Sequence, residues 1–271
     1  MPKIALLSDI HANLTALEAV LKEVQSSGAE DIVFLGDIVG YGAHPAECVK
    51  WVRKLSGQIV IGNHDAALGV FRKSGYEPPQ NNWRRDDYAC GLMHAVKTLP
   101  NEDLDWLLAQ PYWFGIPGAI VAHASLDDPN LFNYIEDQES ADPSLDLLAK
   151  FPHPVGFFGH THIQNVFSSN PGAVEWLGKD KFYIDDGEPC AVTVGSVGQP
   201  REEDNRKASW ALWDPEHRIV EFRRTDYDRL KAARAIVDAG LPLDAAIRLL
   251  EPEEMQIFLH ECARNGNKEH S

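Results

Sequence analysis

Seven side chains of types that bind metal ions occur in five short clusters of the 271-residue chain. They are Asp9, His11, Asp37, Asn63, His123, His160 and His162. Asp9 and His11 are separated by one residue, so in an extended chain both side chains point to the same side and can reach one ion. The mixture of imidazole and oxygen atoms favours manganese, iron, zinc or nickel over calcium. We call these residues the seven candidate ligands.

Each cluster taken alone has an ordinary structural explanation. An aspartate after a strand is usually a turn former or a helix N-cap, and a lone histidine such as His123 is more often packed or exposed. Taken together, the clusters indicate a metal site, because each one directly follows an apolar run of the sequence. Asp37 could then bridge two ions, Asn63 could add a carbonyl oxygen, and His64 could face a substrate.

The apolar runs predict strands that would bring the clusters together. Strands are expected at residues 3–7, 32–35, 58–61, 119–122 and 154–158. Leucines and valines spaced about one turn apart predict helices between the first three strands. This βαβαβ pattern implies parallel strands joined by right-handed crossovers. Ligands of open α/β sheets bind outside the carboxyl ends of the strands, where the clusters should therefore meet.

The other parts of the chain predict an insertion, an antiparallel second half and a helical tail. Residues 66–112 are expected to form a helical insertion that could overhang the site. Short strands with tight turns are expected at 165–169, 181–184, 191–194, 209–213 and 219–223. Two amphipathic helices broken at Gly240 and Pro242 are expected in the tail. We therefore predict a domain at 1–225 and a helical appendage at 226–271 packed on the same domain.

Composition excludes several classes of protein. The formal net charge of −16 disfavours duplex nucleic acid and anionic membranes as partners. The four cysteines are far apart and form no CxxC pair, so neither a zinc ribbon nor a thioredoxin-like site is expected. No apolar run approaches the roughly 20 residues that span a bilayer, and the first residues lack the features of a signal peptide. We expect a cytoplasmic location.

The five clusters resemble the sequence blocks of the calcineurin-like metallophosphoesterase superfamily. The blocks here are Asp9-x-His11, Gly36-Asp37, Gly62-Asn63-His64-Asp65, His123 and Gly159-His160-Thr161-His162. The segment 195–201 is similar to a stretch of the small bacterial and archaeal phosphodiesterase branch, sometimes labelled diadenosine-tetraphosphatase-like. The resemblance implies an α/β fold: a four-layer α/β/β/α sandwich of two mixed β-sheets flanked by helices, with the insertion and the C-terminal helices added.

The resemblance also implies a role for each block. Two divalent or trivalent metal ions would be bound. Asp9, His11 and His162 would hold the first ion, Asn63, His123 and His160 would hold the second, and Asp37 would bridge them. A metal-bridging hydroxide would attack the phosphorus atom. His64 would be the catalytic side chain that protonates the leaving oxygen or stabilises its developing charge.

One block departs from the pattern of the protein Ser/Thr phosphatases. Asp37 is followed by Ile38, Val39, Gly40 and Tyr41, where that pattern has an acidic residue and an arginine. We therefore expect a hydrolase of phosphodiester or phosphomonoester bonds in a small, phosphorylated or nucleotide-like substrate. Two alternatives stay open: a dinucleoside polyphosphate hydrolase, and a non-catalytic metal-binding scaffold of the same fold.

A few further residues are candidates for contact with the substrate. Tyr41 and His44 follow the block of Asp37 and could line the pocket, while Arg201 could bind a second phosphate or remain in solvent. Trp83, Arg84 and Arg85 of the insertion could stack on a base and contact phosphate, or could pack and pair locally. The sequence leaves open whether the chain forms a homo-oligomer.

Overall fold

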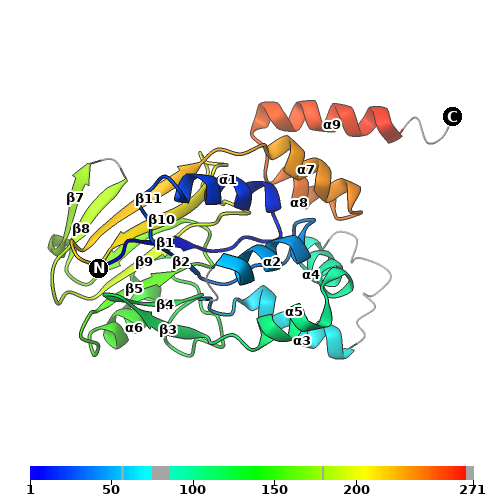
Figure 1. The fold of residues 1–271 in the computed structure, drawn as a ribbon. Coiled ribbons are helices and arrows are strands. Elements are labelled where there is room, and N and C mark those ends of the chain that lie inside the picture. Colours follow the sequence, from blue (N-terminus) through cyan, green and yellow to red (C-terminus); the bar gives the residue numbers. More distant parts are fainter. Residues whose placement is uncertain (56–57, 75–85, 179, 267–271) are drawn as a thin grey trace.

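Two β-sheets pack face to face and are flanked by helices (Figure 1) in a computed structural model that describes residues 1–55, 58–74, 86–178 and 180–266. One sheet runs in the order β2 (Asp31–Phe34), β1 (Ile4–Leu7), β10 (Ala208–Asp214), β11 (Ile219–Thr225), β8 (Lys181–Ile184) and β7 (Val174–Gly178). The other runs in the order β3 (Trp113–Ile116), β4 (Ala119–Ala122), β5 (Val155–Phe158), β9 (Cys190–Val194) and β6 (Gln164–Ser168). Both sheets contain parallel and antiparallel pairs, as predicted.

The apolar faces of the two sheets form the central core. Leu6 of β1, Val33 of β2, Val121 of β4 and Phe157 of β5 are fully buried in one cluster between the sheets. Strands covered on both faces read as continuous apolar runs, because neither face meets water. This explains why short runs in the sequence, and not alternating patterns, marked these strands.

Helices cover the outer face of each sheet. The chain contains α1 (Leu14–Val24), α2 (Pro45–Leu55), α3 (Asn63–Ser74), α4 (Asp87–Thr98), α5 (Asn101–Leu108), α6 (Gln138–Leu148), α7 (Arg229–Asp238), α8 (Leu243–Ile247) and α9 (Pro252–Gly266). The α1 helix buries Leu17, Val20 and Val24 at helical spacing, and Asn13 caps it by accepting the Ala16 N–H. It packs over the six-stranded sheet, whereas α6 covers the five-stranded sheet. The four-layer α/β/β/α sandwich is confirmed.

The third strand expected in the first part of the chain is not formed. Residues 58–61 make only an isolated parallel bridge, between Ile59 and Phe34, at the edge of the six-stranded sheet. The bridge has a backbone hydrogen bond on each side, and the chain then turns at Gly62 into α3. An apolar run predicts burial but not how many of its residues pair with the neighbouring strand.

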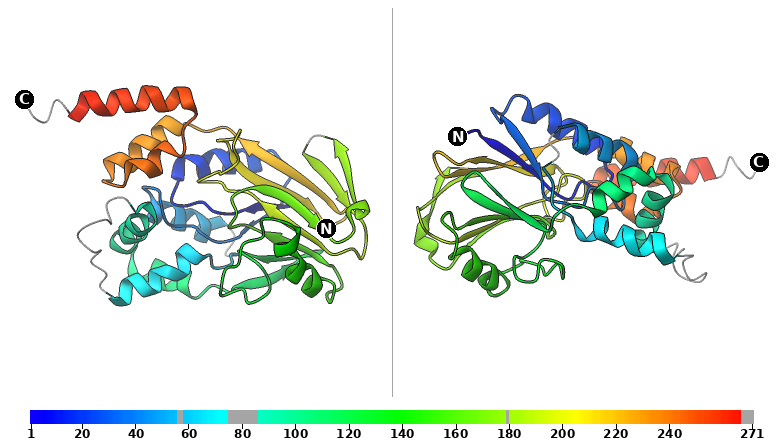
Figure 2. Two further views of the ribbon diagram at one scale, coloured as in Figure 1. Left: turned by 180° about the vertical axis from the view of Figure 1, so that it is seen from behind. Right: turned by 60° about the horizontal axis from the view of Figure 1, so that its bottom comes forward.

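The C-terminal tail contains three described helices, where two were expected. The short α8 lies against α7, and α7 packs on α1. The last helix, α9, stands away from the body of the molecule (Figure 2) and attaches through the buried Phe258 and the ion pair of Arg229 with Glu254. No helix among the described residues is both long enough and apolar enough to cross a membrane.

Candidate metal centre

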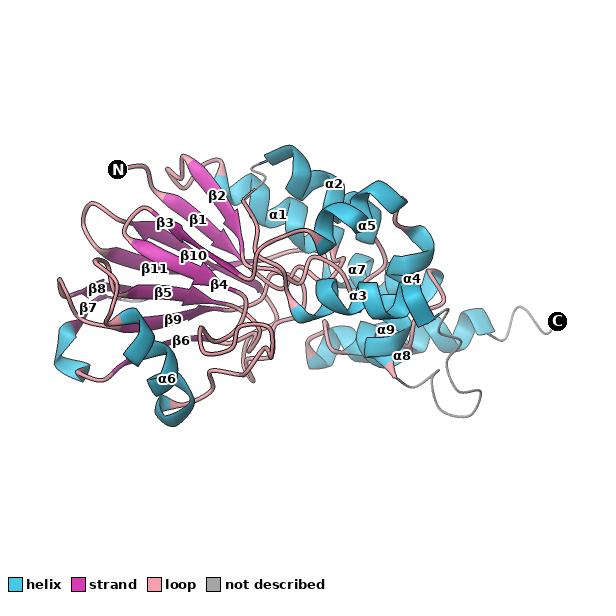
Figure 3. Cartoon of the chain, turned by 90° about the horizontal axis from the view of Figure 1, so that it is seen from below, coloured by secondary structure: helices cyan, strands magenta, loops and turns pink. Residues whose placement is uncertain are grey.

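All seven candidate ligands meet at one end of the sandwich. Four of the loops that carry them follow β1, β2, β4 and β5, and Asn63 begins α3. Figure 3 shows these loops gathered between the strand ends and the helices α2 to α5. The shared edge follows from topology, because parallel strands present their carboxyl ends on the same side.

The first group of side chains contains Asp9, His11 and His162, whose potential ligand atoms lie within 4.8 Å of one another. His162 Nε2 lies 3.0 Å from Asp9 Oδ1 and 3.1 Å from His11 Nε2. All three residues are buried. These atoms are therefore placed to share one small cation.

The second group contains Asp37, His123 and His160, with Asn63 beside it. His123 Nε2 lies 3.1 Å from Asn63 Oδ1 and 3.4 Å from Asp37 Oδ2. Asp37 also faces the first group, since its Oδ2 atom lies 3.8 Å from Nε2 of His11. Asp37 is thus the residue at which the two groups join.

The protonation of the histidines follows from their backbone partners. Nδ1 of His11 lies 3.1 Å from the Val39 carbonyl oxygen, and Nδ1 of His162 lies 2.5 Å from that of Gln199. A carbonyl only accepts hydrogen bonds, so each Nδ1 carries a proton and each ring turns Nε2 into the centre, where this atom can bind a metal ion. Such carbonyl partners are the usual outer contacts of histidines that bind metals.

Some acceptor atoms of this centre have no hydrogen-bond donor. Asp9 Oδ1 and His160 Nε2 are buried and have no hydrogen-bond partner. Most buried polar atoms in proteins are paired, and an unpaired one costs about 1–3 kcal/mol. A pair of metal ions would satisfy these atoms, so the residues present fit such ions.

Backbone N–H groups fix the remaining oxygens of the two aspartates. The amide of His160 donates to Asp9 Oδ2 at 2.9 Å, and the amide of His64 donates to Asp37 Oδ1 at 2.8 Å. The second oxygen of each carboxylate, Oδ1 of Asp9 and Oδ2 of Asp37, points at histidine Nε2 atoms. Each carboxylate is thereby held in one orientation.

The backbone under the centre is locally strained. Five of the seven candidate ligands, Asp9, His11, Asp37, His160 and His162, have positive φ, between 48° and 67°. This left-handed conformation is uncommon outside glycine, and strained residues cluster at functional sites. The glycines of the blocks permit the close packing: a Cβ on Gly62 would lie 2.1 Å from Asp37 Oδ1, and one on Gly159 would lie 1.9 Å from Ser8 Oγ.

Burial and neighbouring charges shift the pKa values of the buried aspartates and histidines of the centre in opposite directions. Burial alone would raise the pKa of Asp37, but His123, His64 and His11 outweigh it and hold this pKa well below its usual range. Burial would lower the pKa of His123, yet Asp37 raises it to about 9. Burial lowers the pKa of His64 to about 3 and that of His160 to about 4. The centre therefore combines ionised carboxylates with two imidazoles that resist protonation, His64 and His160, and one that is readily protonated, His123.

His64 lies inside the same centre. Its Nε2 atom lies 3.9 Å from Asp37 Oδ2, and its ring centroid lies 4.6 Å from those of His11 and Tyr88. The Nδ1 atom is buried without a hydrogen-bond partner. The ring is held by neighbouring rings, and one nitrogen faces the centre.

The predicted substrate contacts lie at different depths. The buried Tyr41 ring lies 4.8 Å from the His11 ring, and burial raises the pKa of Tyr41 to about 12. Arg201 is exposed, and its charge acts on both Tyr41 and His162. His44 is half-buried, and its backbone N–H donates to Ala12. Trp83, Arg84 and Arg85 lie outside the described residues.

Several residues at the centre were not singled out from the sequence. Asp65 is fully buried and accepts the backbone N–H groups of Ile38, Val39 and Gly62, which ties the loop after β2 to the start of α3. Arg248 of the tail forms an ion pair with Asp87 of α4 at 2.7 Å. The position of Asp65 in the Gly62–Asp65 block was the feature of the sequence that could have indicated its role at the centre. For Arg248 there was none, because the contact joins segments far apart in sequence.

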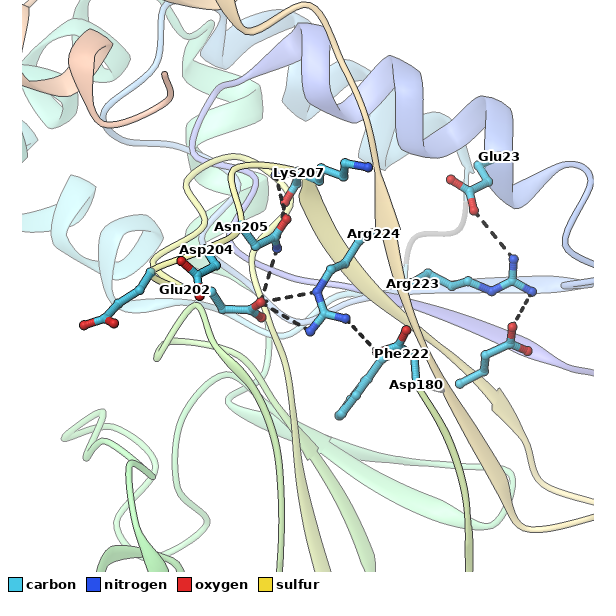
Figure 4. Close-up of a pocket in the computed structure, with 11 residues that line it drawn as sticks. Glu23, Asp180, Glu202, Asp204, Asn205, Lys207, Phe222, Arg223 and Arg224 are labelled. Carbon is cyan, nitrogen blue, oxygen red and sulfur yellow. Dashed lines mark hydrogen bonds and ion pairs between the residues drawn. The ribbon is translucent and has the colours of Figure 1, made fainter. Parts of the chain in front are cut away.

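A second charged region is lined by none of the seven candidate ligands. We call it the Arg224 cavity; it has a volume of about 720 Å³ and is shown in Figure 4. It is lined by Glu23, Asp180, Glu202, Glu203, Asp204, Asn205, Lys207, Glu221, Phe222, Arg223 and Arg224. Acidic side chains outnumber basic ones, and Arg224 is tied to Asp180 and Glu202. The lining disfavours an anionic ligand.

The chain matches known proteins along most of its length. The family model described as calcineurin-like phosphoesterase matches residues 2–182. An uncharacterized protein of Methanocaldococcus jannaschii is 36% identical over 249 residues, which cover 88% of this chain and 93% of that protein. A solved metallophosphoesterase from Sphaerobacter thermophilus is 31% identical, with a TM-score of 0.74 and coverage of 92% of this chain and 98% of that one.

One further relative carries a specific name. A protein of Actinobacillus pleuropneumoniae called symmetrical bis(5'-nucleosyl)-tetraphosphatase is 35% identical over 200 residues. The match covers 65% of this chain and 63% of that protein. The similarity therefore leaves more than a third of that relative unmatched.

Proposed function

Since this chain belongs to the calcineurin-like phosphoesterase family, we propose that it is a dinuclear metal-dependent hydrolase of phosphodiester or phosphomonoester bonds. Its substrate is small or nucleotide-like. The observation that carries the proposal is the meeting of buried, unpartnered acceptor atoms on both sides of Asp37. A non-catalytic scaffold would not require the additional histidine, His64, whose ring faces the same centre.

We assign the candidate ligands to two ions. Asp9, His11 and His162 would hold the first ion, Asn63, His123 and His160 would hold the second, and Asp37 would contribute to both. Support comes from Asp37, which lies in one group of potential ligand atoms with His123 and His160 and in another with His11 and His64, and from the carbonyl partners that fix the histidine rings. When bound, the ions would supply Lewis acidity and an activated water.

The protein's own side chains then position the phosphoester. His64 faces the phosphoryl group and stabilises the charge of the leaving oxygen, since one nitrogen points toward Asp37 and the ring is held by His11 and Tyr88. It protonates this oxygen only if the negative charge of the bound phosphate raises the low pKa of the ring. Arg201, whose charge reaches the first group, contacts a phosphate oxygen that does not react. Tyr41 and His44 line the pocket beside it.

Hydrolysis of a generic substrate tests this function. The protein is stripped with a chelator and assayed with bis(p-nitrophenyl) phosphate and p-nitrophenyl phosphate. We expect no turnover until manganese, iron, zinc or nickel is added, and the ratio of the two rates will show the preferred ester. Failure of all four metals to bind or to restore turnover would contradict the proposal, and metal binding without turnover would favour the scaffold alternative.

A second candidate function is hydrolysis of dinucleoside polyphosphates. It is favoured by the relative named symmetrical bis(5'-nucleosyl)-tetraphosphatase, although the match covers 63% of that protein. Incubation of the metal-loaded protein with diadenosine tetraphosphate, followed by chromatography of the products, tests it. Cleavage into two molecules of adenosine diphosphate supports this function, and an intact substrate contradicts it.

A further inference from the structure

Three aromatic side chains lie beside the second group of candidate ligands and stay partly open to solvent. We call Tyr112, Phe132 and Tyr134 the aromatic shelf. Tyr112 is 40% exposed and Tyr134 is 44% exposed, whereas Phe132 is half-buried. Large apolar surfaces left in water next to a polar centre often mark a binding site.

The shelf is in direct contact with the metal centre. The ring of Tyr134 stacks on that of His160, with centroids 3.8 Å apart and an angle of 22° between the planes. The ring of Phe132 lies 5.9 Å from those of His123 and Tyr112, which extends the aromatic surface outward. A group bound on the shelf would therefore lie beside a phosphate held at the second ion.

The loop that carries Phe132 and Tyr134 is anchored on both sides. The amide of Ser125 donates to the Asn133 carbonyl, the amide of Leu126 donates to Ser144 Oγ of α6, and Ile135 is buried. These contacts present the two rings from a fixed loop. A fixed surface loses little conformational entropy when it binds a ligand.

Phe132 also has an unusual backbone. Its φ is +55°, and a bulky residue in this left-handed region is a genuine outlier. Such strain persists only where the surrounding contacts enforce it, and it is concentrated at functional sites. Phe132 contacts the rings of both Tyr112 and His123. The strained backbone therefore holds the ring that connects the outer part of the shelf to the metal centre.

We infer that the aromatic shelf binds a planar aromatic group of the substrate, a nucleobase or an aryl ester, next to the phosphoester. This inference rests on the proposed function and narrows its substrate class. Stacking of a base on an aromatic side chain stabilises binding by roughly 1–3 kcal/mol and suits any base, because every base has a π-face. The shelf carries no charged side chain of its own, so it selects the flat group and not the phosphate.

Binding to the manganese-loaded His64→Ala variant, which is expected to keep its metal but to hydrolyse esters slowly, tests the inference without requiring turnover. Calorimetry compares adenosine 5'-monophosphate with ribose 5-phosphate, which shares the sugar and phosphate but lacks the base. We expect the base to improve affinity about tenfold. A parallel comparison of phenyl phosphate with inorganic phosphate shows whether an aryl group is enough. Equal affinities within both pairs would overturn the inference, even if the protein hydrolyses phosphoesters.

Variants locate the effect on the shelf. Tyr134→Ala and Tyr112→Ala should each reduce the preference for the base severalfold, and Tyr134→Phe should retain it. Trp176→Ala is the matched control, because Trp176 is 60% exposed on β7 of the other sheet. If Tyr134→Ala weakens both ligands equally, Tyr134 only supports His160 and the inference is wrong. It is also wrong if Tyr112→Ala changes the oligomeric state, measured by sedimentation, and leaves the preference unaltered.

Discussion

The metal centre and the Arg224 cavity are both lined by charged side chains, but they satisfy those charges differently. In the cavity, Arg224 meets Asp180 and Glu202, and Arg223 meets Glu221 and Glu23. In the metal centre, carboxylate oxygens and imidazole nitrogens face one another, and three of these atoms, Asp9 Oδ1, His64 Nδ1 and His160 Nε2, have no hydrogen-bond partner. Nε of Arg223 is also buried without a hydrogen-bond partner, but both arginines have carboxylates beside them. The comparison teaches that arginines paired with neighbouring carboxylates can serve the structure alone, whereas buried acceptor atoms that face other acceptors call for a cation.

The backbone separates the two regions in the same way. Five of the seven candidate ligands have positive φ, whereas only Asp180 does among the eleven residues that line the cavity. Strain of this kind costs of order 1–3 kcal/mol per residue. It is concentrated where the chain must aim several side chains at one point.

Replacing the bridging aspartate should give the largest difference between the regions. Asp37→Asn keeps the shape but removes the charge, and Lewis-acid stabilisation is worth several kcal/mol. We expect a loss of turnover of about a thousandfold or more, together with lost metal, measured by elemental analysis. The matched change in the cavity, Glu221→Gln, should retain both turnover and metal content. An equal loss in this variant would contradict the distinction between the metal centre and the cavity.

His64 separates chemistry from metal binding within the centre. His64→Ala should reduce turnover by about 10²–10⁴-fold, the usual range for an acid–base residue. The metal content should stay at the wild-type level, because His64 is not assigned to either ion. A variant that loses metal would show that His64 is a ligand and that the proposed role is wrong.

Metal removal should affect stability more than salt does. An ion at a hundred times its dissociation constant stabilises the folded state by about 2.7 kcal/mol, which corresponds to roughly 5–10 °C in melting temperature for a chain of this size. Salt weakens exposed ion pairs such as those of the cavity by about 1 kcal/mol or less. Thermal melts with manganese, with chelator and with 0.5 M sodium chloride compare the two; a larger shift from salt would contradict the expectation.

The smallest effect is expected from a change in the cavity itself. Glu202→Gln removes the charge that pairs with Arg224 but keeps an oxygen for the Gln164 amide. A partly exposed pair is worth about 1 kcal/mol or less, so the melting temperature should fall by about 2–4 °C. Turnover should change by less than about twofold, since the pair supplies no group to the metal centre. A large drop in turnover would show that the Arg224 cavity contributes to catalysis and would contradict this expectation.

The sequence predicted the ligand-bearing strands because they are buried on both faces. The expected runs at 3–7, 32–35, 119–122 and 154–158 correspond to β1, β2, β4 and β5. The β3 strand was missed because its residues alternate between exposed and half-buried and include the exposed Trp113. The run at 58–61 was assigned as a strand because burial alone does not reveal an edge position.

The meeting of the candidate ligands was predictable, but their surroundings were not. The Gly62–Asp65 and Gly159–His162 blocks place several polar groups within four residues, which is a local signal. Tyr134 against His160 joins residues 26 positions apart through a loop with no regular pattern. Contacts of this kind depend on how two sheets and their loops pack, which local periodicity does not encode.

The seven candidate ligands and the groups around them come from different pieces of chain. The ligands follow β1, β2, β4 and β5 or begin α3, whereas the aromatic shelf belongs mainly to the loop before α6 and Arg248 to the tail. Selectivity can therefore be altered by exchanging a surface segment while the reactive machinery keeps its geometry. We therefore expect that exchange of the loop before α6 would change which flat groups are bound and leave the candidate ligands in place, in evolution or in engineering.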